Sequence, residues 1–109
     1  MPNQAGAGAS ILARMFKRSN PEPPEPLEIV LYGRHRCHLC EVADDVLRAI
    51  SGQLPLTVRT VDIDQDQRLV EEFDIRIPVV ALGDGSVLAE GQVEYKPLYA
   101  SLRKKLKEN

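Results

Sequence analysis

The chain has 109 residues and a mass of 12.1 kDa, which is enough for one ordinary domain with a short extension and too little for two. Hydrophobic residues make up 43% of the chain and charged residues 28%, as in soluble globular proteins. Fourteen Lys and Arg against sixteen Asp and Glu give a formal net charge of −2. This balance lacks the basic excess that attracts nucleic-acid phosphates, so we expect no nucleic-acid partner.

Residues 1–26 differ in composition from the rest of the chain. They contain five of the eight prolines, which deny the backbone its helical donors. The first 20 residues carry Arg14, Lys17 and Arg18 and no acidic residue, and their longest apolar run is too short for a secretory signal or a membrane span. We therefore expect a flexible Ala/Pro-rich tail and linker at 1–26, a folded domain at 27–109 and a cytoplasmic location. Organelle targeting by the basic segment stays open.

The spacing of apolar residues in 27–63 predicts a strand, a helix and a second strand. Leu27–Tyr32 is an apolar, β-branched run that Gly33 ends, which is typical of a buried strand. Apolar residues then recur at helical spacing from Leu39 to Ile50, which predicts an amphipathic helix. Leu56–Ile63 alternates as a second strand does. A strand, a crossover helix and a second strand form a right-handed parallel unit.

The remaining pattern predicts a short helix, a β-hairpin and a final helix. Asp64 and Gln67 have the spacing of a helix cap, ahead of a short apolar face. Arg76–Leu82 is predicted to form a strand, with Ser86–Glu90 as its antiparallel partner. The last helix is predicted to begin near Pro97 and to turn its leucines inward, namely Leu98, Leu102 and Leu106.

In chain order, the predicted elements are strand, helix, strand, helix, strand, strand and helix. Parallel pairing is expected within the first unit and antiparallel pairing within the hairpin. This order fits a three-layer α/β fold, in which a mixed four-stranded sheet carries helices on both faces.

The only two cysteines lie three positions apart in Cys37-His38-Leu39-Cys40, where the loop after the first strand becomes the first helix. A bridge this short adds little stability, so we expect the pair to do chemistry. Cys37 should lie at or beside the helix N-cap, where unpaired backbone N–H groups and the helix dipole favour a thiolate. Arg34 and Arg36 are close enough in sequence to add to this effect. We expect the pKa of Cys37 to lie below its reference value of about 8.5.

The spacing of the two cysteines gives their thiols different surroundings. Nearly one helical turn brings the sulfurs within bridging range, while Cys40 faces the sheet. Cys37 would then attack a substrate disulfide, and Cys40 would displace the resulting mixed disulfide. The sequence therefore predicts dithiol–disulfide exchange.

Other uses of this segment stay open at the level of sequence. His35, Cys37, His38 and Cys40 are four potential ligands for a structural zinc ion. An iron–sulfur cluster bridged between two chains, each offering Cys37, is a second option. A catalytically idle module that keeps its fold for protein contacts is a third. In the redox interpretation His38 tunes the reaction, because a protonated imidazole stabilises the neighbouring thiolate and raises the reduction potential.

Three segments together resemble the thioredoxin superfamily, and most of all its small glutaredoxin-like members: Leu31-Tyr32-Gly33, Cys37-His38-Leu39-Cys40 and Arg76-Ile77-Pro78-Val79-Val80. The resemblance implies that Pro78 is cis and packs beside the active-site sulfurs, and that the backbone of Ile77 pairs with the substrate. Thioredoxins carry an aromatic residue where this chain has Arg36. The stretch that matches the Gly-Gly and acidic pair of glutaredoxins reads Gly91-Gln92-Val93-Glu94.

We therefore expect a thioredoxin-like, more closely glutaredoxin-like, domain that acts as a thiol-disulfide oxidoreductase, with Cys37 as nucleophile and Cys40 as resolving thiol. Its substrates would be protein or low-molecular-weight disulfides, and glutathione is a candidate co-substrate. Arg34, Arg36 and Arg76 would meet the carboxylates of glutathione or of an acidic protein. This chemistry requires no metal or prosthetic group. We expect no transmembrane segment and a monomer.

Overall fold

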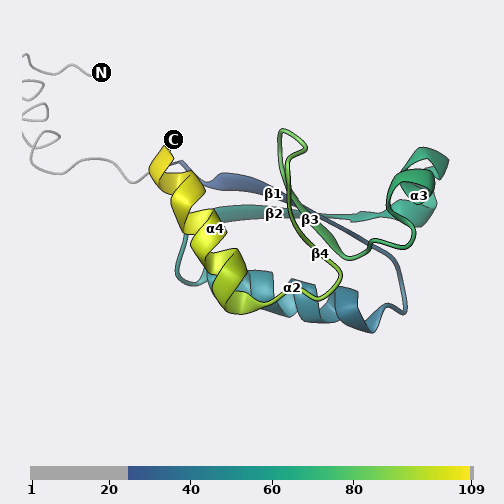
Figure 1. Cartoon of the computed structure of the whole chain (residues 1–109), viewed down its shortest axis with the longest axis horizontal. Coiled ribbons are helices and arrows are strands. Elements are labelled where there is room, and N and C mark those ends of the chain that lie inside the picture. Colours follow the sequence, from purple (N-terminus) through teal and green to yellow (C-terminus); the bar gives the residue numbers. More distant parts are fainter. Residues whose placement is uncertain (1–24, 109) are drawn as a thin grey trace, which may run out of the picture.

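The computed structural model describes residues 25–108 of the chain. Its elements follow in the order β1 (Leu27–Gly33), α2 (His38–Ser51), β2 (Leu56–Asp62), the 3-10 turn η1 (Ile63–Gln65), α3 (Gln67–Phe73), β3 (Val79–Leu82), β4 (Val87–Glu90) and α4 (Tyr95–Glu108) (Figure 1). The predicted tail at 1–26 lies outside the described residues except for Glu25 and Pro26. No helix within 25–108 is long and apolar enough to cross a membrane.

The four strands form one mixed sheet in the order β2-β1-β3-β4. β1 lies parallel to β2, in a register that pairs Leu27 with Leu56 and Tyr32 with Val61. β1 is antiparallel to β3, and β3 is antiparallel to β4. This pairing confirms the predicted mixed sheet. It also makes β1 an inner strand whose C-terminal end leads directly into the cysteine motif.

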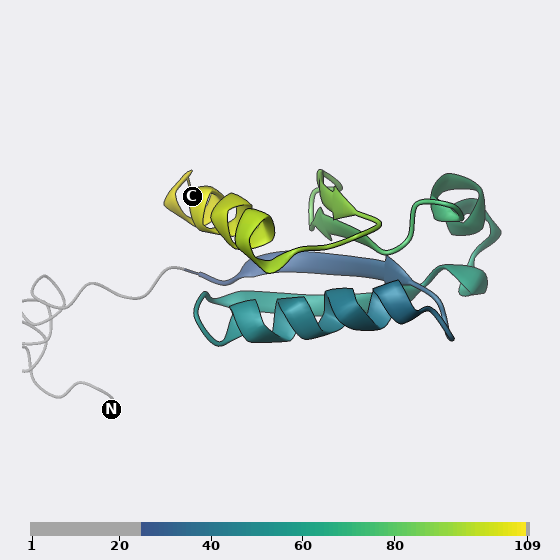
Figure 2. The same ribbon diagram turned by 60° about the horizontal axis from the view of Figure 1, so that its bottom comes forward.

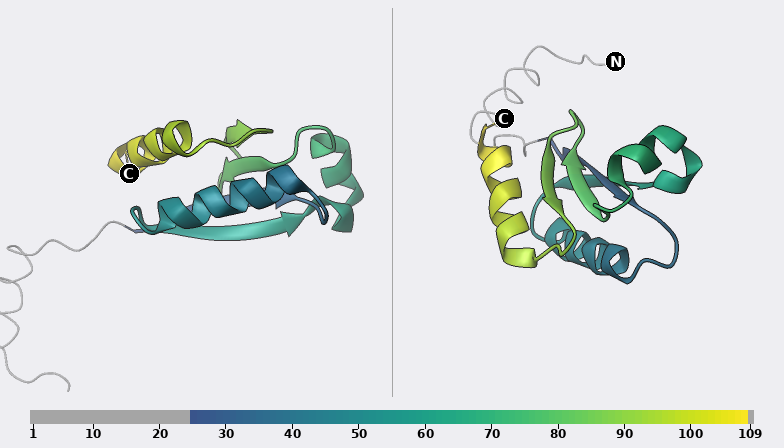
Figure 3. Two further views of the ribbon diagram at one scale, coloured as in Figure 1. Left: turned by 90° about the horizontal axis from the view of Figure 1, so that it is seen from below. Right: turned by 45° about the vertical axis from the view of Figure 1, so that its right-hand side comes forward.

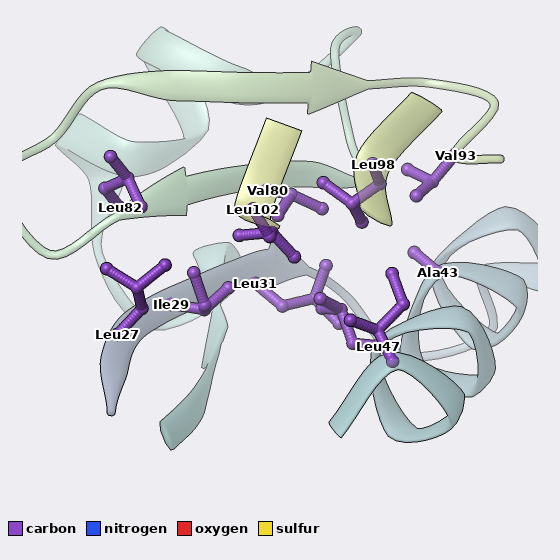
Figure 4. Close-up of a cluster of buried hydrophobic side chains, with 11 residues drawn as sticks. Leu27, Ile29, Leu31, Ala43, Leu47, Val80, Leu82, Val93, Leu98 and Leu102 are labelled. Carbon is purple, nitrogen blue, oxygen red and sulfur yellow. The ribbon is translucent and has the colours of Figure 1, made fainter. Parts of the chain in front are cut away.

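Side chains of α2 and α4 meet those of β1 and β3 in one hydrophobic core. Alternate residues of β1 point into it, as the two-residue period of a strand requires, and α2 runs along β1 and β2 (Figure 2). Packing in this core fixes α2, and with it the cysteines of its first turn, against β1. The core residues, each at most 9% exposed, are shown in Figure 4: Leu27, Ile29, Leu31, Ala43, Leu47, Ile50, Val80, Leu82, Val93, Leu98 and Leu102.

The short helix α3 lies on the other face of the sheet, away from α2 and α4 (Figure 3). Tyr32 points to that face because it alternates with the core residue Leu31. Its ring stacks on the ring of Phe73 from α3, with the two centroids 4.5 Å apart. Helices therefore cover both faces of the sheet, as predicted. No residue of α3 is fully buried, so surface contacts hold this helix in place.

The cap of α3 differs from the prediction. Asp64 lies inside η1, and the N-cap of α3 is Asp66, whose carboxylate accepts the backbone N–H of Arg68 at 2.9 Å. β2 ends at Asp62, one residue before the predicted Ile63. The reason is that the Asp62 carboxylate accepts the N–H of Asp64 at 2.9 Å and starts a separate turn there. This segment holds two successive caps where the sequence suggests one.

The third strand also begins later than predicted. The N–H groups of Arg76 and Ile77 donate to the carbonyl of Phe73, at 2.8 and 3.1 Å. These two residues therefore belong to the turn that leaves α3, and β3 begins at Val79. The predicted hairpin with β4 and the final helix α4, with Pro97 in its first turn, are confirmed.

Candidate functional site

The loop after β1 places Cys37 at the N-cap of α2. Its backbone is extended, with φ −118° and ψ 103°, and its sulfur accepts the backbone N–H of Cys40 at 3.1 Å. The carbonyl of Cys37 accepts the N–H of Glu41 at 3.1 Å, which is the first bond of the helix. The sulfur of Cys37 thus faces the unpaired donors of a helix N-terminus, the location that the sequence predicts.

Cys37 and Cys40 are joined by a disulfide bond, and their Cα atoms are 5.2 Å apart. Cys37 is half-buried, whereas Cys40 is only 8% exposed. The Cys40 sulfur lies against the end of β1, because a Cβ placed on Gly33 would be 3.0 Å from it. The pair therefore has one outward and one sheltered sulfur. A dithiol that attacks with one sulfur and resolves with the other needs this asymmetry.

The peptide bond between Ile77 and Pro78 is cis. Pro78 is buried, and its carbonyl accepts the N–H of Gly91 at 2.9 Å. The next residue, Val79, pairs with Tyr32 near the end of β1. Since the cysteine loop leaves the sheet from that same end of β1, the Ile77-Pro78 turn and the cysteine motif lie at one edge of the sheet.

Arg34 forms ion pairs with two carboxylates. Its guanidinium holds Asp64 through Nε and Nη2 at 3.2 and 2.9 Å, and Asp74 through Nη1 at 2.8 Å. These hydrogen bonds raise the pKa of Arg34 and hold the pKa of Asp64 below its ordinary value. Arg34 thereby ties the loop after β1 to η1 and to the end of α3.

Arg76 also forms ion pairs with two carboxylates. Its guanidinium donates to Glu72 and to Glu90, both at 2.9 Å, and lies 5.1 Å from the centroid of the Phe73 ring. The hydrogen bond to Glu90 is the main reason that the pKa of Arg76 is raised. Substrate binding by Arg34 and Arg76 stays a prediction, and a substrate carboxylate would have to compete with these partners.

Arg36 has a different environment from the other two arginines. It is exposed, it lies directly before Cys37, and its backbone has a φ of +59°. A side-chain-bearing residue rarely adopts this left-handed conformation outside tight turns. Within residues 25–108, no carboxylate forms an ion pair with Arg36.

The two histidines lie at the surface beside the cysteines. His38 is the first residue of α2 and is exposed. His35 is 90% exposed at its side chain, with Nε2 3.4 Å from a carboxylate oxygen of Asp62. Within residues 25–108, no three His, Cys, Asp or Glu side chains are grouped so that they could hold a metal ion.

A cavity of about 490 Å³ opens beside the disulfide. Its walls come from the loop after β1, the first turns of α2 and the end of β2, and both cysteines line it. Four acidic side chains also line it, namely Glu41, Asp44, Asp45 and Asp62. The sequence prediction did not include these residues. The signal available was the acidic outer face of the first helix, which falls one turn after the cysteines.

Solved structures of other proteins have a similar fold. A protein of Nitrosomonas europaea solved in solution by NMR is 27% identical, with a TM-score of 0.66, and the match covers 74% of this chain and 96% of that one. A structural-genomics target protein from X. campestris is 28% identical, with a TM-score of 0.61, over 70% of this chain and 96% of that one. A mutant thioredoxin from Halobacterium salinarum is 20% identical, with a TM-score of 0.57, over 73% of this chain and 74% of that one.

These likenesses confirm the predicted thioredoxin-like fold. No curated protein matches the chain. The family model described as "Glutaredoxin-like domain (DUF836)" matches residues 28–107, which include the cysteine motif and all of the four strands except Leu27, the first residue of β1. With that match, the chain belongs to the family of proteins with this glutaredoxin-like domain.

Proposed function

We propose that the protein is a thiol-disulfide oxidoreductase that exchanges disulfides through Cys37 and Cys40. The observation that carries the proposal is the hydrogen bond from the Cys40 N–H to the Cys37 sulfur at the start of α2. In the disulfide this N–H group donates to a neutral sulfur. After reduction it would donate to the negatively charged thiolate of Cys37, and this hydrogen bond would be stronger. The position of the Ile77-Pro78 turn at the same edge of the sheet and the family match support the proposal.

The reaction transfers two electrons from the dithiol to the substrate. The Cys37 thiolate attacks one sulfur of the substrate disulfide, so that a Cys37–substrate bond forms and the other substrate sulfur leaves as a thiolate and takes up a proton. Cys40 then loses its proton and attacks the Cys37 sulfur. This second step releases the second substrate thiol and leaves the Cys37–Cys40 disulfide. Two thiols of a donor, for which glutathione is a candidate, regenerate the dithiol by two such exchanges in the reverse direction and leave as the donor disulfide.

The Ile77-Pro78 turn is the proposed platform for the substrate backbone. The N–H of Ile77 already donates to the carbonyl of Phe73 at 3.1 Å. The Ile77 carbonyl is therefore the group that we assign to an extended substrate segment. We place the reaction in a reducing compartment such as the cytoplasm. Disulfides that form in such a compartment are usually transient and catalytic, which fits this reaction.

Trapping of the mixed disulfide tests this function. Cys37→Ser should abolish reduction of a peptide disulfide, whereas Cys40→Ser should retain the first attack and accumulate a Cys37–peptide adduct visible by intact mass spectrometry. Elemental analysis of the freshly purified wild-type protein and of both variants belongs in the same experiment. Absence of the adduct, together with a metal that both variants lose completely, would contradict the exchange reaction and favour a metal carrier. Absence of both the adduct and a metal would favour an idle binding module.

A further inference from the structure

The cavity beside the disulfide carries an excess of negative charge. Glu41 and Asp45 are exposed on the outer face of α2. Within residues 25–108, neither forms an ion pair. Asp44 is paired with Arg48 at 2.8 Å, and Asp62 has only the imidazole of His35 near it, at 3.4 Å. Arg36 is the one permanent cation of this cavity that lacks an ion pair among the described residues.

The two ion-paired arginines add to this excess rather than offset it. Arg34 is shared by Asp64 and Asp74, so this cluster has one surplus negative charge. Arg76 is shared by Glu72 and Glu90, which gives a second surplus charge next to the Ile77-Pro78 turn. Each of these two clusters therefore has one surplus negative charge, in addition to the carboxylates that line the cavity.

We infer that the preferred substrate of this site is a disulfide in a basic polypeptide segment, whose Lys or Arg side chain enters the acidic cavity while its cysteine meets Cys37. This inference rests on the proposed function and names its substrate class. The cavity, at about 490 Å³, is within the size range of small-ligand pockets. Because both Cys37 and Cys40 line it, a side chain close to the substrate cysteine reaches the carboxylates without leaving the reacting sulfur. Glutathione has more carboxylates than ammonium groups, so the same field disfavours it.

Three oxidised peptides test the substrate class. The peptides share one length and one internal disulfide and differ only in the residues that flank the cysteines, which are Lys, Gln or Glu. Rate constants for their reduction by the reduced wild-type protein are measured by chromatography of quenched samples. At low salt the Lys peptide should react at least about tenfold faster than the Glu peptide, because a field of opposite sign raises encounter rates. High salt should remove most of the difference, because it screens exposed charges.

Charge-neutralising variants test the assignment to the cavity. The double variant Glu41→Gln with Asp45→Asn should lower the ratio of the Lys-peptide rate to the Gln-peptide rate by about fivefold. One unit charge about 8 Å away in water changes a rate by about two- to threefold, and the double variant removes two such charges. The ratio is used because neutralising Glu41 also changes the reactivity of Cys37 towards every peptide. The matched control is Glu108→Gln. It removes one carboxylate at the end of α4, away from the start of α2 (Figure 1), and should leave the ratio unchanged.

The possible failures are distinguishable. Equal rates for the three peptides, faster reduction of the Glu peptide, or faster reduction of glutathione disulfide than of the Lys peptide would overturn the inference and leave the exchange reaction standing. An unchanged ratio in the double variant would overturn the assignment to Glu41 and Asp45. If no peptide, including the neutral one, were reduced, the proposed function itself would fail and the inference with it.

Discussion

At the residue scale, the sheltered sulfur depends on the absence of a side chain at Gly33. β1 ends so close to the first turn of α2 that a Cβ on residue 33 would lie only 3.0 Å from the Cys40 sulfur. The resolving sulfur is thereby kept at the base of the site, while the Cys37 sulfur stays at the helix N-cap. The difference between the two thiols thus has a local steric cause as well as an electrostatic one.

Gly33→Ala should destabilise the oxidised protein by about 1–3 kcal/mol, the usual cost of inserting an extra methyl group into a packed site. The added Cβ would lie 3.0 Å from the Cys40 sulfur and 3.2 Å from its Cβ. Urea unfolding measures the change. The control is Gly52→Ala, because φ is −73° at that position and the nearest atom is a carbonyl oxygen 3.3 Å away. A loss no larger in Gly33→Ala than in the control would contradict the contact.

At the element scale, α3 differs from the helices α2 and α4, each of which has buried residues. It has no fully buried residue, and its contacts are the Tyr32–Phe73 stack and the arginine pairs with Asp74 and Glu72. Exposed ion pairs of this kind contribute little to the stability of the whole molecule. They also position the turn that leads into Ile77-Pro78, so the attachment of α3 affects the shape of the site.

The contact between Arg34 and Asp64, which ties the loop after β1 to η1, should depend on acidic pH. Arg34 lowers the pKa of this carboxyl in the folded state, so its contribution is present above the unfolded value of about 3.9 and is lost as the pH falls through the folded value. The NMR resonance of the Arg34 Nε–H should follow this titration, with a midpoint below 3.9. Arg34→Gln should move the midpoint of Asp64 back towards its ordinary value. A midpoint at or above the ordinary value in the wild type would contradict the pairing.

The elements that could be predicted from sequence are those with strong periodicity. The run that became β1 and the apolar spacing of α2 each determine a buried face within one segment. The cap of α3 could not be assigned as firmly, because Asp62, Asp64 and Asp66 all offer an oxygen to a following N–H and only the packed chain selects among them. The predicted start of β3 was wrong because the N–H groups of Arg76 and Ile77 donate to the Phe73 carbonyl, so that these residues form a turn and not a strand.

In the site, too, local features could be predicted from the sequence, whereas contacts between distant segments could not. The cysteine motif and its place at a helix start are local features, so they are visible in the sequence. The partners of Arg34 lie 30 and 40 residues away, and nothing in the local sequence indicates that its charge is taken up within the fold. The acidic cavity likewise joins α2 to the end of β2, so it exists only after those two elements pair with β1.

At the scale of the whole molecule, α4 closes the hydrophobic core that it shares with α2, β1 and β3. Leu102 is fully buried among residues of β1, α2 and β3 (Figure 4). Leu102→Ala should lower the free energy of unfolding by about 2–5 kcal/mol, through lost burial and the cavity left behind. Leu39→Ala, at a site that is 39% exposed, should cost less than about 1 kcal/mol. Similar losses in the two variants by urea unfolding would contradict the place of Leu102 in this core.

The ionisation of Cys37 tests the redox account most directly. In the reduced Cys40→Ser variant, the alkylation rate of Cys37 with iodoacetamide is measured as a function of pH. The helix N-terminus should give a titration with a pKa below the reference value of about 8.5. In the reduced wild type, the half-buried thiol of Cys37 should be alkylated well before the buried thiol of Cys40. A Cys37 pKa at or above the reference value, or faster alkylation of Cys40, would contradict the assignment of Cys37 as the nucleophile.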